Sequence, residues 1–316
     1  MSPDPDAPQT TIAARPAWAP AERERPTWGF DEGDEIAPGR TVLRRLGGGS
    51  RYDVYLVWDD HLLAVMVAKL LRPDQAEDVG ALRDLTREAG ALSALAHPVL
   101  VRCFDAVLEG KHPHLLIEFL EGPTLHALIT DGEPLVLEQL LALAMHTAAA
   151  LHYMAGEGWV HLDVKPGNIV KGAPPRLIDL SVARTVERAR RLSGAIGTDA
   201  YMAPEQVAAG GPGGEARVGP PADVFGLGAT LHHALTGGVP FPREDGARES
   251  SDAAVRWPQL VRASAPLPRR GPPALAALVR RCLDPDPAAR PAAAEVAAEL
   301  EPLVAGLPRA MVLGRR

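Results

Sequence analysis

The chain has 316 residues, of which 46% are hydrophobic, so it can bury a large core as one two-lobed domain or as two ordinary domains. Its formal net charge of −7 argues against a nucleic-acid partner, because binding to a phosphate backbone needs a clustered excess of Lys and Arg. Cys103 and Cys282 are the only cysteines, too few for a zinc cluster or a disulfide framework, which favours a reducing compartment.

The N-terminal residues show neither the basic region nor the apolar core of a secretory signal, and no apolar stretch reaches the length of about 18 residues that a membrane span needs. We therefore expect a cytoplasmic protein without a membrane span. Residues 1–38 are rich in Pro, Ala and charge and lack periodicity, which predicts a flexible tail. Trp18, Trp28 and Phe30 are candidate docking anchors, although aromatic rings resting loosely on the domain are the preferred interpretation.

The segment that begins at Thr41 is rich in β-branched and aromatic residues. Short runs of these residues predict an antiparallel meander and two further strands, at residues 41–46, 53–58, 62–71, 101–107 and 114–120. Between the third and fourth runs, apolar residues recur at helical spacing at Leu82, Leu85, Ala89, Leu92 and Leu95. This predicted helix ends before His97 and Pro98.

Beyond Gly122 the pattern becomes helical. One predicted face contains Leu137, Leu140, Leu141, Ala144, Leu151 and Met154, and a later one contains Val224, Leu227, Leu231 and Leu235. The Gly/Pro-rich stretch from Ala208 to Pro221 predicts a surface loop. The chain therefore reads as an α+β protein, with a mostly β lobe that contains one helix followed by a mostly helical lobe.

A glycine cluster separates the first two predicted strands, at Gly47, Gly48 and Gly49. Small residues there let backbone N–H groups approach phosphates closely, although an ordinary turn explains the cluster equally well. Lys69 ends an apolar strand, where a charge is costly to bury without an anionic partner. Glu88, on the inner stripe of the next helix, is the candidate partner, and a purely stabilising pair would explain these two residues alone.

Four polar residues follow in two motifs, Asp163, Lys165 and Asn168 in HLDVKPGN and Asp179 in LIDLS. Phosphoryl transfer needs such a set, because it uses oxygen ligands for Mg²⁺, a cation over the migrating group and a carboxylate for the incoming hydroxyl. Asn168 is the only asparagine in the chain, and Lys69 and Lys165 are two of only four lysines. Chance placement of these residues is therefore difficult to defend.

Together with Gly197 to Glu205 (GTDAYMAPE), these motifs resemble in order and spacing the signature set of eukaryotic-like (Hanks-type) bacterial serine/threonine protein kinases. The resemblance implies a bilobal protein kinase fold, with an N-lobe at 39–120, a C-lobe at 121–305 and a C-terminal tail at 306–316. It also implies an enzyme that uses ATP and Mg²⁺, or Mn²⁺, to phosphorylate Ser and Thr hydroxyls of protein substrates, and that phosphorylates itself.

The resemblance assigns roles position by position. Asp163 would accept the proton of the substrate hydroxyl, Lys165 would contact the γ-phosphate, and Lys165 with Thr198 resembles the serine/threonine branch. Asn168 and Asp179 would ligate the metal. The nucleotide-binding residues would be Leu46, Gly47, Gly48, Gly49, Val54, Val67, Lys69, Glu88, Glu118 and Leu120, with Ile117 as gatekeeper. Structural support would come from Glu205 paired with Arg290, and from Asp223 beneath the catalytic loop.

The sequence departs from this family pattern at four positions. Leu162 replaces the arginine that binds a phosphorylated activation loop, so we expect that phosphorylation of Ser193 or Thr185 is not needed by that route. Ser181 replaces a glycine and predicts restricted switching. Val67 and Tyr52, the latter at the third glycine of the phosphate loop, add bulk near the nucleotide and would raise the KM for ATP.

Two alternatives remain open. A pseudokinase that acts as a nucleotide-binding scaffold is compatible with the four departures, although every polar group needed for transfer is present. A small-molecule kinase would share the cleft, but it would lack the segment ending at Glu205 and its Arg290 partner. The sequence reveals neither the substrate, nor the activating signal, nor the oligomeric state.

Overall fold

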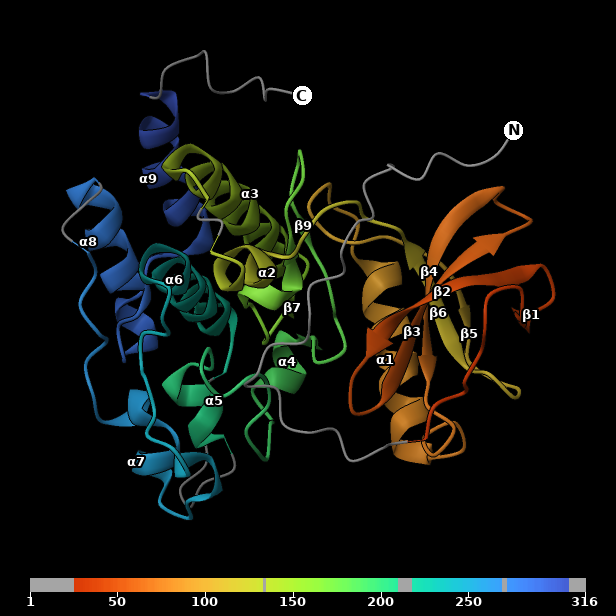
Figure 1. Ribbon diagram of the computed structural model, residues 1–316. Coiled ribbons are helices and arrows are strands. Elements are labelled where there is room, and N and C mark those ends of the chain that lie inside the picture. The colour runs from red at the N-terminus through yellow and green to blue at the C-terminus, as the bar shows by residue number, and fades with distance from the viewer. Residues whose placement is uncertain (1–25, 133–134, 210–217, 269–271, 307–316) are drawn as a thin grey trace.

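The computed structural model describes residues 26–132, 135–209, 218–268 and 272–306. The chain forms a β-rich lobe first and a largely helical lobe second, and the two lie side by side (Figure 1). The predicted fold class, a bilobal protein kinase fold of the α+β type, is confirmed by this order of elements.

The N-lobe contains a six-stranded sheet with the order β1-β2-β3-β4-β6-β5, in which all neighbours are antiparallel. Its β-branched and aromatic residues suit a pleated, partly buried surface. The strands are β1 (Glu35–Ala37), β2 (Arg40–Gly48), β3 (Tyr52–Asp59), β4 (Ala64–Leu71), β5 (Cys103–Val107) and β6 (His114–Glu118). Strands β2 to β6 match the five predicted runs.

Helix α1 (Val79–Ala94) is the predicted N-lobe helix. It begins after Asp78, whose side chain accepts a hydrogen bond from the backbone N–H of Ala81 at 2.7 Å, which caps an otherwise unpaired donor. Its buried face is apolar except for Glu88. The fold therefore turns one carboxylate inward, where it needs a positively charged partner.

The C-lobe is built from helices and short strands. The helices are α2 (Leu125–Thr130), α3 (Leu137–Gly156), α4 (Val186–Ala189), α5 (Pro204–Ala208), α6 (Pro220–Thr236), α7 (Ala253–Arg256), α8 (Pro273–Cys282) and α9 (Ala293–Ala305). Four short 3₁₀ turns lie at η1 (Pro166–Asn168), η2 (Ala247–Glu249), η3 (Pro258–Leu260) and η4 (Pro287–Ala289). The two-stranded sheets pair β7 (Trp159–Val160) with β10 (Arg184–Thr185) and β8 (Ile169–Val170) with β9 (Arg176–Leu177).

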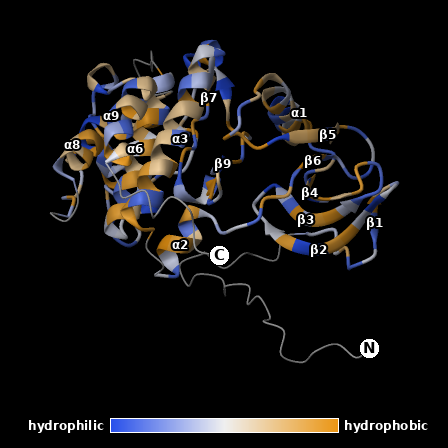
Figure 2. Ribbon diagram, turned by 90° about the horizontal axis from the view of Figure 1, so that it is seen from above, coloured by the Kyte–Doolittle hydropathy of each residue, from blue (hydrophilic) through white to orange (hydrophobic). Residues whose placement is uncertain are grey.

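Helix α6 lies at the centre of the C-lobe and is buried on most of its surface. Two glycines let its neighbours approach closely: a Cβ atom on Gly226 would lie 2.9 Å from the carbonyl oxygen of Val164, and one on Gly228 would lie 2.6 Å from the Cβ of Cys282. The segment after β7, which contains Asp163, therefore rests directly on α6. Figure 2 shows α6 among the other C-lobe helices, with the N-lobe sheet beside them.

The helices of the described ranges are all too short or too polar to cross a membrane. The predicted surface loop from Ala208 to Pro221 falls largely on residues 210–217, which lie outside the described residues, as do Trp18 and the C-terminal tail from 307 onward. Those predictions stay open.

The N-terminal segment differs from the sequence expectation. Residues 26–38 were predicted to belong to a flexible tail, but they contain strand β1, which pairs with β2. The indole N–H of Trp28 donates a 2.7 Å hydrogen bond to the carbonyl oxygen of Leu71, and Trp28 and Phe30 both pack edge-on against His112. These aromatic residues anchor the segment, because they pack against the buried N-lobe cluster and Trp28 also bonds to the carbonyl group of Leu71.

Candidate active site

A cleft of about 310 Å³ lies between the two lobes. Apolar side chains form most of its surface, and four polar residues converge at one end. The residues that line it are Leu46, Val54, Val67, Lys69, Glu88, Leu92, Val101, Ile117, Glu118, Phe119, Leu120, Asn168, Val170, Ile178 and Asp179. A largely apolar pocket with a few convergent polar groups is the usual form of a small-molecule site.

The N-lobe wall of the cleft carries a buried lysine with two carboxylate partners. The Nζ of Lys69, on β4, donates to both carboxylate oxygens of Glu88, at 2.8 and 3.0 Å, and to Oδ1 of Asp179 at 2.8 Å. Burial alone would lower the pKa of Lys69, but the two carboxylates raise the pKa above its usual value. The lysine is therefore a fixed positive charge at this end of the cleft.

Asp179 joins the two lobes through this contact. Burial would raise its pKa, but the Lys69 ammonium group holds the pKa below the usual range, so the carboxylate is ionised. Its backbone adopts a φ of +67°, a conformation that is uncommon for residues other than glycine. Strain of this kind persists only where the surrounding structure imposes it, and it is frequent at functional sites.

The C-lobe wall of the site continues past the cleft residue Asn168 to three side chains outside the cleft lining, which form a closed hydrogen-bonded triangle. The Nζ of Lys165 donates to Oδ2 of Asp163 and to Oγ1 of Thr198, both at 2.7 Å, and Thr198 donates to Oδ1 of Asp163, also at 2.7 Å. Asp163 is 9% exposed, and the hydrogen bonds to both of its oxygens fix its carboxylate in position. The arrangement presents an oriented acceptor beside a positive charge.

Asn168, in the 3₁₀ turn η1, borders this triangle. Its Nδ2 donates to the backbone oxygen and to Oδ2 of Asp163, at 2.9 and 3.1 Å, which leaves the amide oxygen as its ligating atom. Within the described ranges no group of three or more His, Cys, Asp or Glu side chains is arranged to hold a metal. The donor set of Asn168 and Asp179 fits Mg²⁺, which takes one or two protein oxygens and completes its shell with phosphate and water.

The backbone before Asp163 is held by Asp223, from α6. The carboxylate oxygens of Asp223 accept from the N–H groups of His161 and Leu162, each at 2.7 Å. Leu162 has a φ of +66°, and its carbonyl oxygen accepts from Nε2 of Gln206 at 2.9 Å. The carboxylate and the amide thus stabilise a strained loop conformation that costs on the order of 1–3 kcal/mol by itself.

A bidentate ion pair supports the C-lobe below the cleft. The guanidinium group of Arg290 donates to both oxygens of Glu205, at 2.7 and 2.9 Å, and to the carbonyl oxygen of Pro221 at 2.9 Å. The Arg290 side chain is fully buried. The structure therefore joins the two residues that the sequence analysis had paired across 85 positions.

The glycine cluster does not line the cleft. Leu46 and Val54 on either side of it do, whereas the predicted nucleotide-binding residues Gly47, Gly48 and Gly49 are absent from the lining. The turn is tight, since a Cβ atom on Gly48 would lie 2.4 Å from the carbonyl oxygen of Tyr52. In this structure Gly47 and Gly48 end β2 and pair with β3, Gly49 begins the turn to β3, and all three glycines are absent from the cleft lining.

Phe119 lies within the segment Glu118 to Leu120, which the family resemblance assigns to the adenine-binding hinge, whereas four lining residues were not predicted: Leu92, Val101, Val170 and Ile178. Two of these residues, Val170 and Ile178, could have been predicted from their distance in sequence to the polar motif residues. Val170 follows Asn168 by two residues, and Ile178 precedes Asp179, so both lie on the short strands or turns that present the polar groups. Leu92 was recognised as part of the apolar face of α1 but not as a cleft residue.

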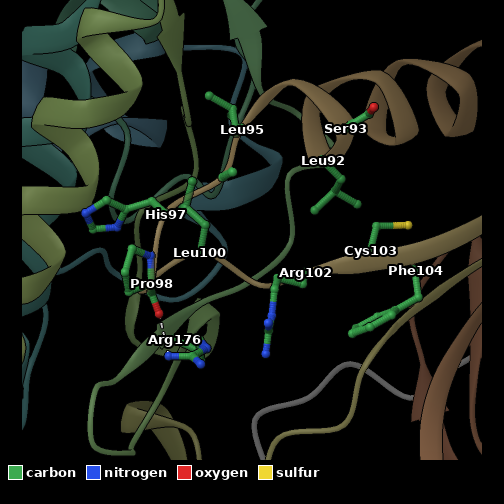
Figure 3. A pocket seen from close by; sticks show the side chains of 11 residues that line it. Leu92, Ser93, Leu95, His97, Pro98, Leu100, Arg102, Cys103, Phe104 and Arg176 are labelled. Carbon is green, nitrogen blue, oxygen red and sulfur yellow. Dashed lines mark hydrogen bonds between the residues drawn. The ribbon is translucent and has the colours of Figure 1, made fainter. Parts of the chain in front are cut away.

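A second hollow, of about 540 Å³, lies near the C-terminal end of α1 and is lined by Leu92, Cys103, Phe104, Arg102 and Arg176, among others (Figure 3). Arg176 donates to the carbonyl oxygen of Pro98, as the dashed line in Figure 3 marks. Both arginines also lie within 3.5 Å of the Glu118 carboxylate. The cations of this hollow are therefore already paired.

The sequence matches the protein kinase domain family over residues 40–300. Among curated proteins it is similar to the serine/threonine-protein kinase pkn2 of Myxococcus xanthus (32% identity, covering 82% of this chain and 31% of the relative). It is also similar to the probable serine/threonine-protein kinase PkwA of Thermomonospora curvata (34%, covering 84% and 34%) and to PknB of Mycolicibacterium smegmatis (31%, covering 81% and 41%). The chain thus spans well under half the length of these relatives.

Proposed function

The chain belongs to the protein kinase family, and from this premise we propose that it is a serine/threonine protein kinase that transfers the γ-phosphoryl group of ATP to Ser and Thr hydroxyls of proteins, itself included. The observation that carries the proposal is the triangle of Asp163, Lys165 and Thr198, which is hydrogen-bonded to the cleft residue Asn168.

The proposed chemistry assigns one task to each group. Asp163 accepts the proton of the incoming hydroxyl, because its carboxylate is fixed by Thr198 and Asn168 and needs no rearrangement. Lys165, hydrogen-bonded to the same carboxylate, places a positive charge where the transferred group gathers negative charge.

Nucleotide binding rests on the N-lobe wall and on the metal ligands. Lys69 binds the α- and β-phosphates, and Glu88 keeps its ammonium group in place. Asn168 and Asp179 would hold Mg²⁺ or Mn²⁺, which would supply positive charge to neutralise the phosphate groups. Leu46, Val54 and Val67 supply an apolar surface for the adenine ring, and the backbone from Glu118 to Leu120 borders the same space.

The choice of Ser and Thr as acceptors rests on Thr198 and on the relatives. Thr198 occupies the position beside Asp163 and Lys165 that resembles the serine/threonine branch, and the curated relatives are named serine/threonine kinases. A second candidate function, a pseudokinase scaffold, is favoured by one observation: the ring of Tyr52 lies over Lys69, 4.5 Å from Nζ to the ring centroid. A scaffold of this kind would bind nucleotide without transferring phosphate.

The test is incubation of the purified chain with γ-labelled ATP and Mg²⁺, with a generic basic protein as acceptor and phosphoserine and phosphothreonine identified by mass spectrometry. Wild type and Lys111→Met are expected to label the acceptor or themselves, because Lys111 is an exposed lysine in the turn between β5 and β6. Lys69→Met, or removal of Mg²⁺ with a chelator, is expected to abolish labelling. A silent wild type that still binds ATP would favour the scaffold, and a wild type that does neither would refute both functions.

A further inference from the structure

The start of β3 is attached to α1 by two adjacent side chains. Arg51 forms an ion pair with Asp84 of α1, and Asp84 also accepts a 2.6 Å hydrogen bond from Arg87. Tyr52, the next residue, is 9% exposed and belongs to the buried cluster that includes Leu85 of α1. The glycine-rich turn is therefore tied to the helix that carries Glu88.

The ring of Tyr52 also covers the lysine of the cleft. Its centroid lies 4.5 Å from the Nζ of Lys69, within the range of a cation–π interaction, which strengthens when the cation is removed from water. The Lys69 side chain is only 12% exposed and has Glu88 and Asp179 as its carboxylate partners. The ammonium group is thus held by two carboxylates and one aromatic face.

The hydroxyl of Tyr52 contributes little to this arrangement. It is buried without a hydrogen-bond partner in the described part of the chain. Burial and the nearby carboxylate of Glu88 raise the pKa of Tyr52 to about 12, so the side chain is neutral at physiological pH. An unpaired buried hydroxyl costs free energy. The stabilising contacts of Tyr52 are therefore those of its ring with Lys69 and with the buried cluster.

We propose that Tyr52 is a positioning residue whose ring clamps Lys69 against Glu88 and joins the glycine-rich turn to α1, so that the Lys69–Glu88 pair is assembled before any nucleotide binds. The effect of Tyr52 on catalysis rests on the proposed kinase function, whereas its effect on the assembly of the Lys69–Glu88 pair does not. Tyr52 begins a regular strand opposite Leu71, so the position needs none of the backbone freedom of glycine.

Two substitutions at position 52 distinguish the effect of the aromatic ring from the effect of the volume it fills, and a third substitution is the control. Tyr52→Phe keeps the ring and removes the unpaired hydroxyl, whereas Tyr52→Leu keeps apolar bulk without an aromatic face. Tyr55→Leu is the matched control, because Tyr55 lies on the same strand, is fully buried and also has an unpartnered hydroxyl. It packs in the other hydrophobic cluster, away from Lys69.

The first readout is the acylation rate of Lys69 in the nucleotide-free protein, measured by mass spectrometry with exposed Lys111 as the internal reference. We expect Tyr52→Leu to raise this rate on the order of threefold to tenfold, with Tyr52→Phe and Tyr55→Leu near wild type. The second readout is hydrogen exchange, in which Tyr52→Leu should accelerate the amides of α1 and leave those of α9 unchanged. Neither readout depends on activity, so a failed kinase assay would not decide the proposal.

If Tyr52→Leu does not fold, phenylalanines with increasing fluorination at position 52 keep the ring shape while weakening its attraction for a cation. The acylation rate of Lys69 should then rise with each added fluorine. If the kinase is active, Tyr52→Leu should reduce kcat/KM for ATP and Tyr52→Phe should not. The proposal is overturned if Tyr52→Phe is as impaired as Tyr52→Leu, if Lys69 reactivity ignores fluorination, or if Tyr55→Leu gives the same pattern.

Discussion

The two walls of the active site are organised in different ways. On the C-lobe wall, Asp163, Lys165 and Thr198 contact one another directly through three hydrogen bonds of 2.7 Å. On the N-lobe wall, Lys69 depends on Glu88 from a separate helix and on the ring of Tyr52 from a neighbouring strand. The C-lobe wall retains the four residues expected to act on phosphate and metal, Asp163, Lys165, Asn168 and Asp179, whereas the N-lobe wall departs from the family pattern at Tyr52 and Val67.

The residues of the C-lobe wall are proposed to take part in the reaction, whereas Tyr52 and Glu88 of the N-lobe wall hold Lys69 in place. A group that accepts a proton or carries charge over a transferred group must have a particular chemical identity, so substitutions there abolish the reaction. A group that positions another group can be replaced by a different contact of similar strength. The loss of a glycine at position 52 therefore coexists with an intact Lys69–Glu88 pair, because the tyrosine ring packs where it supports that pair.

The largest effect is expected on the C-lobe wall. Asp163→Asn retains the shape of the side chain but removes the basic carboxylate, and we expect kcat to fall by about 10²- to 10⁴-fold. The affinity for nucleotide, measured by fluorescence titration, should remain close to wild type because Asp163 is absent from the lining of the nucleotide cleft. An Asp163→Asn variant with normal kcat would show that the walls do not divide the work in this way.

The support below that wall should respond next most strongly. Arg290→Met leaves the carboxylate of Glu205 without its bidentate partner, and we expect a loss of about 3–5 kcal/mol in the free energy of unfolding, measured by urea denaturation. The matched control is Arg281→Met, which breaks an ion pair with Glu299 whose side chains are about half exposed. That change should cost about 1 kcal/mol or less. Equal losses in the two variants would contradict the account.

The smallest effect is expected at the outer face of the N-lobe. Trp28→Ala removes a ring that packs on the sheet and the hydrogen bond to the carbonyl of Leu71, and should lower the free energy of unfolding by about 1–2 kcal/mol. Trp28→Phe, which keeps a ring and loses only the N–H donor, should cost less. A Trp28→Ala variant as stable as wild type would mean that residues 26–38 contribute no more to the free energy of unfolding than a loose tail would.

The order of strands and helices was predictable because long periodic segments carry a strong signal. The clustering of polar residues around Asp163 was also predictable, since the motifs are short and the groups lie near one another in sequence. Strand β1 was not predictable, because three residues show no periodicity and their pairing depends on β2. The contact between Arg51 and Asp84 joins residues 33 positions apart, so it depends on how α1 docks on the sheet.

The alternation of side chains along β3 could have predicted which face of the sheet Tyr52 lies on. Tyr52 and Val54 are two residues apart on β3 and therefore point to the same face of the sheet, and Val54 was already assigned to the nucleotide cleft. The sequence thus placed Tyr52 on the side of Lys69, but its bulk was interpreted only as an obstacle to the nucleotide. Its role as a partner of the lysine required the position of α1.

We expect the cleft to be assembled without activation-loop phosphorylation, because Leu162 replaces the arginine that would bind the phosphorylated loop and the ring of Tyr52 lies over the paired Lys69. The direct measurement is the time course of γ-phosphoryl transfer to an acceptor protein by phosphatase-treated wild-type chain, compared with the same chain after phosphorylation. We predict transfer without a lag and a rate that phosphorylation of Thr185 or Ser193 leaves unchanged. A lag that disappears as either residue becomes phosphorylated would contradict the account.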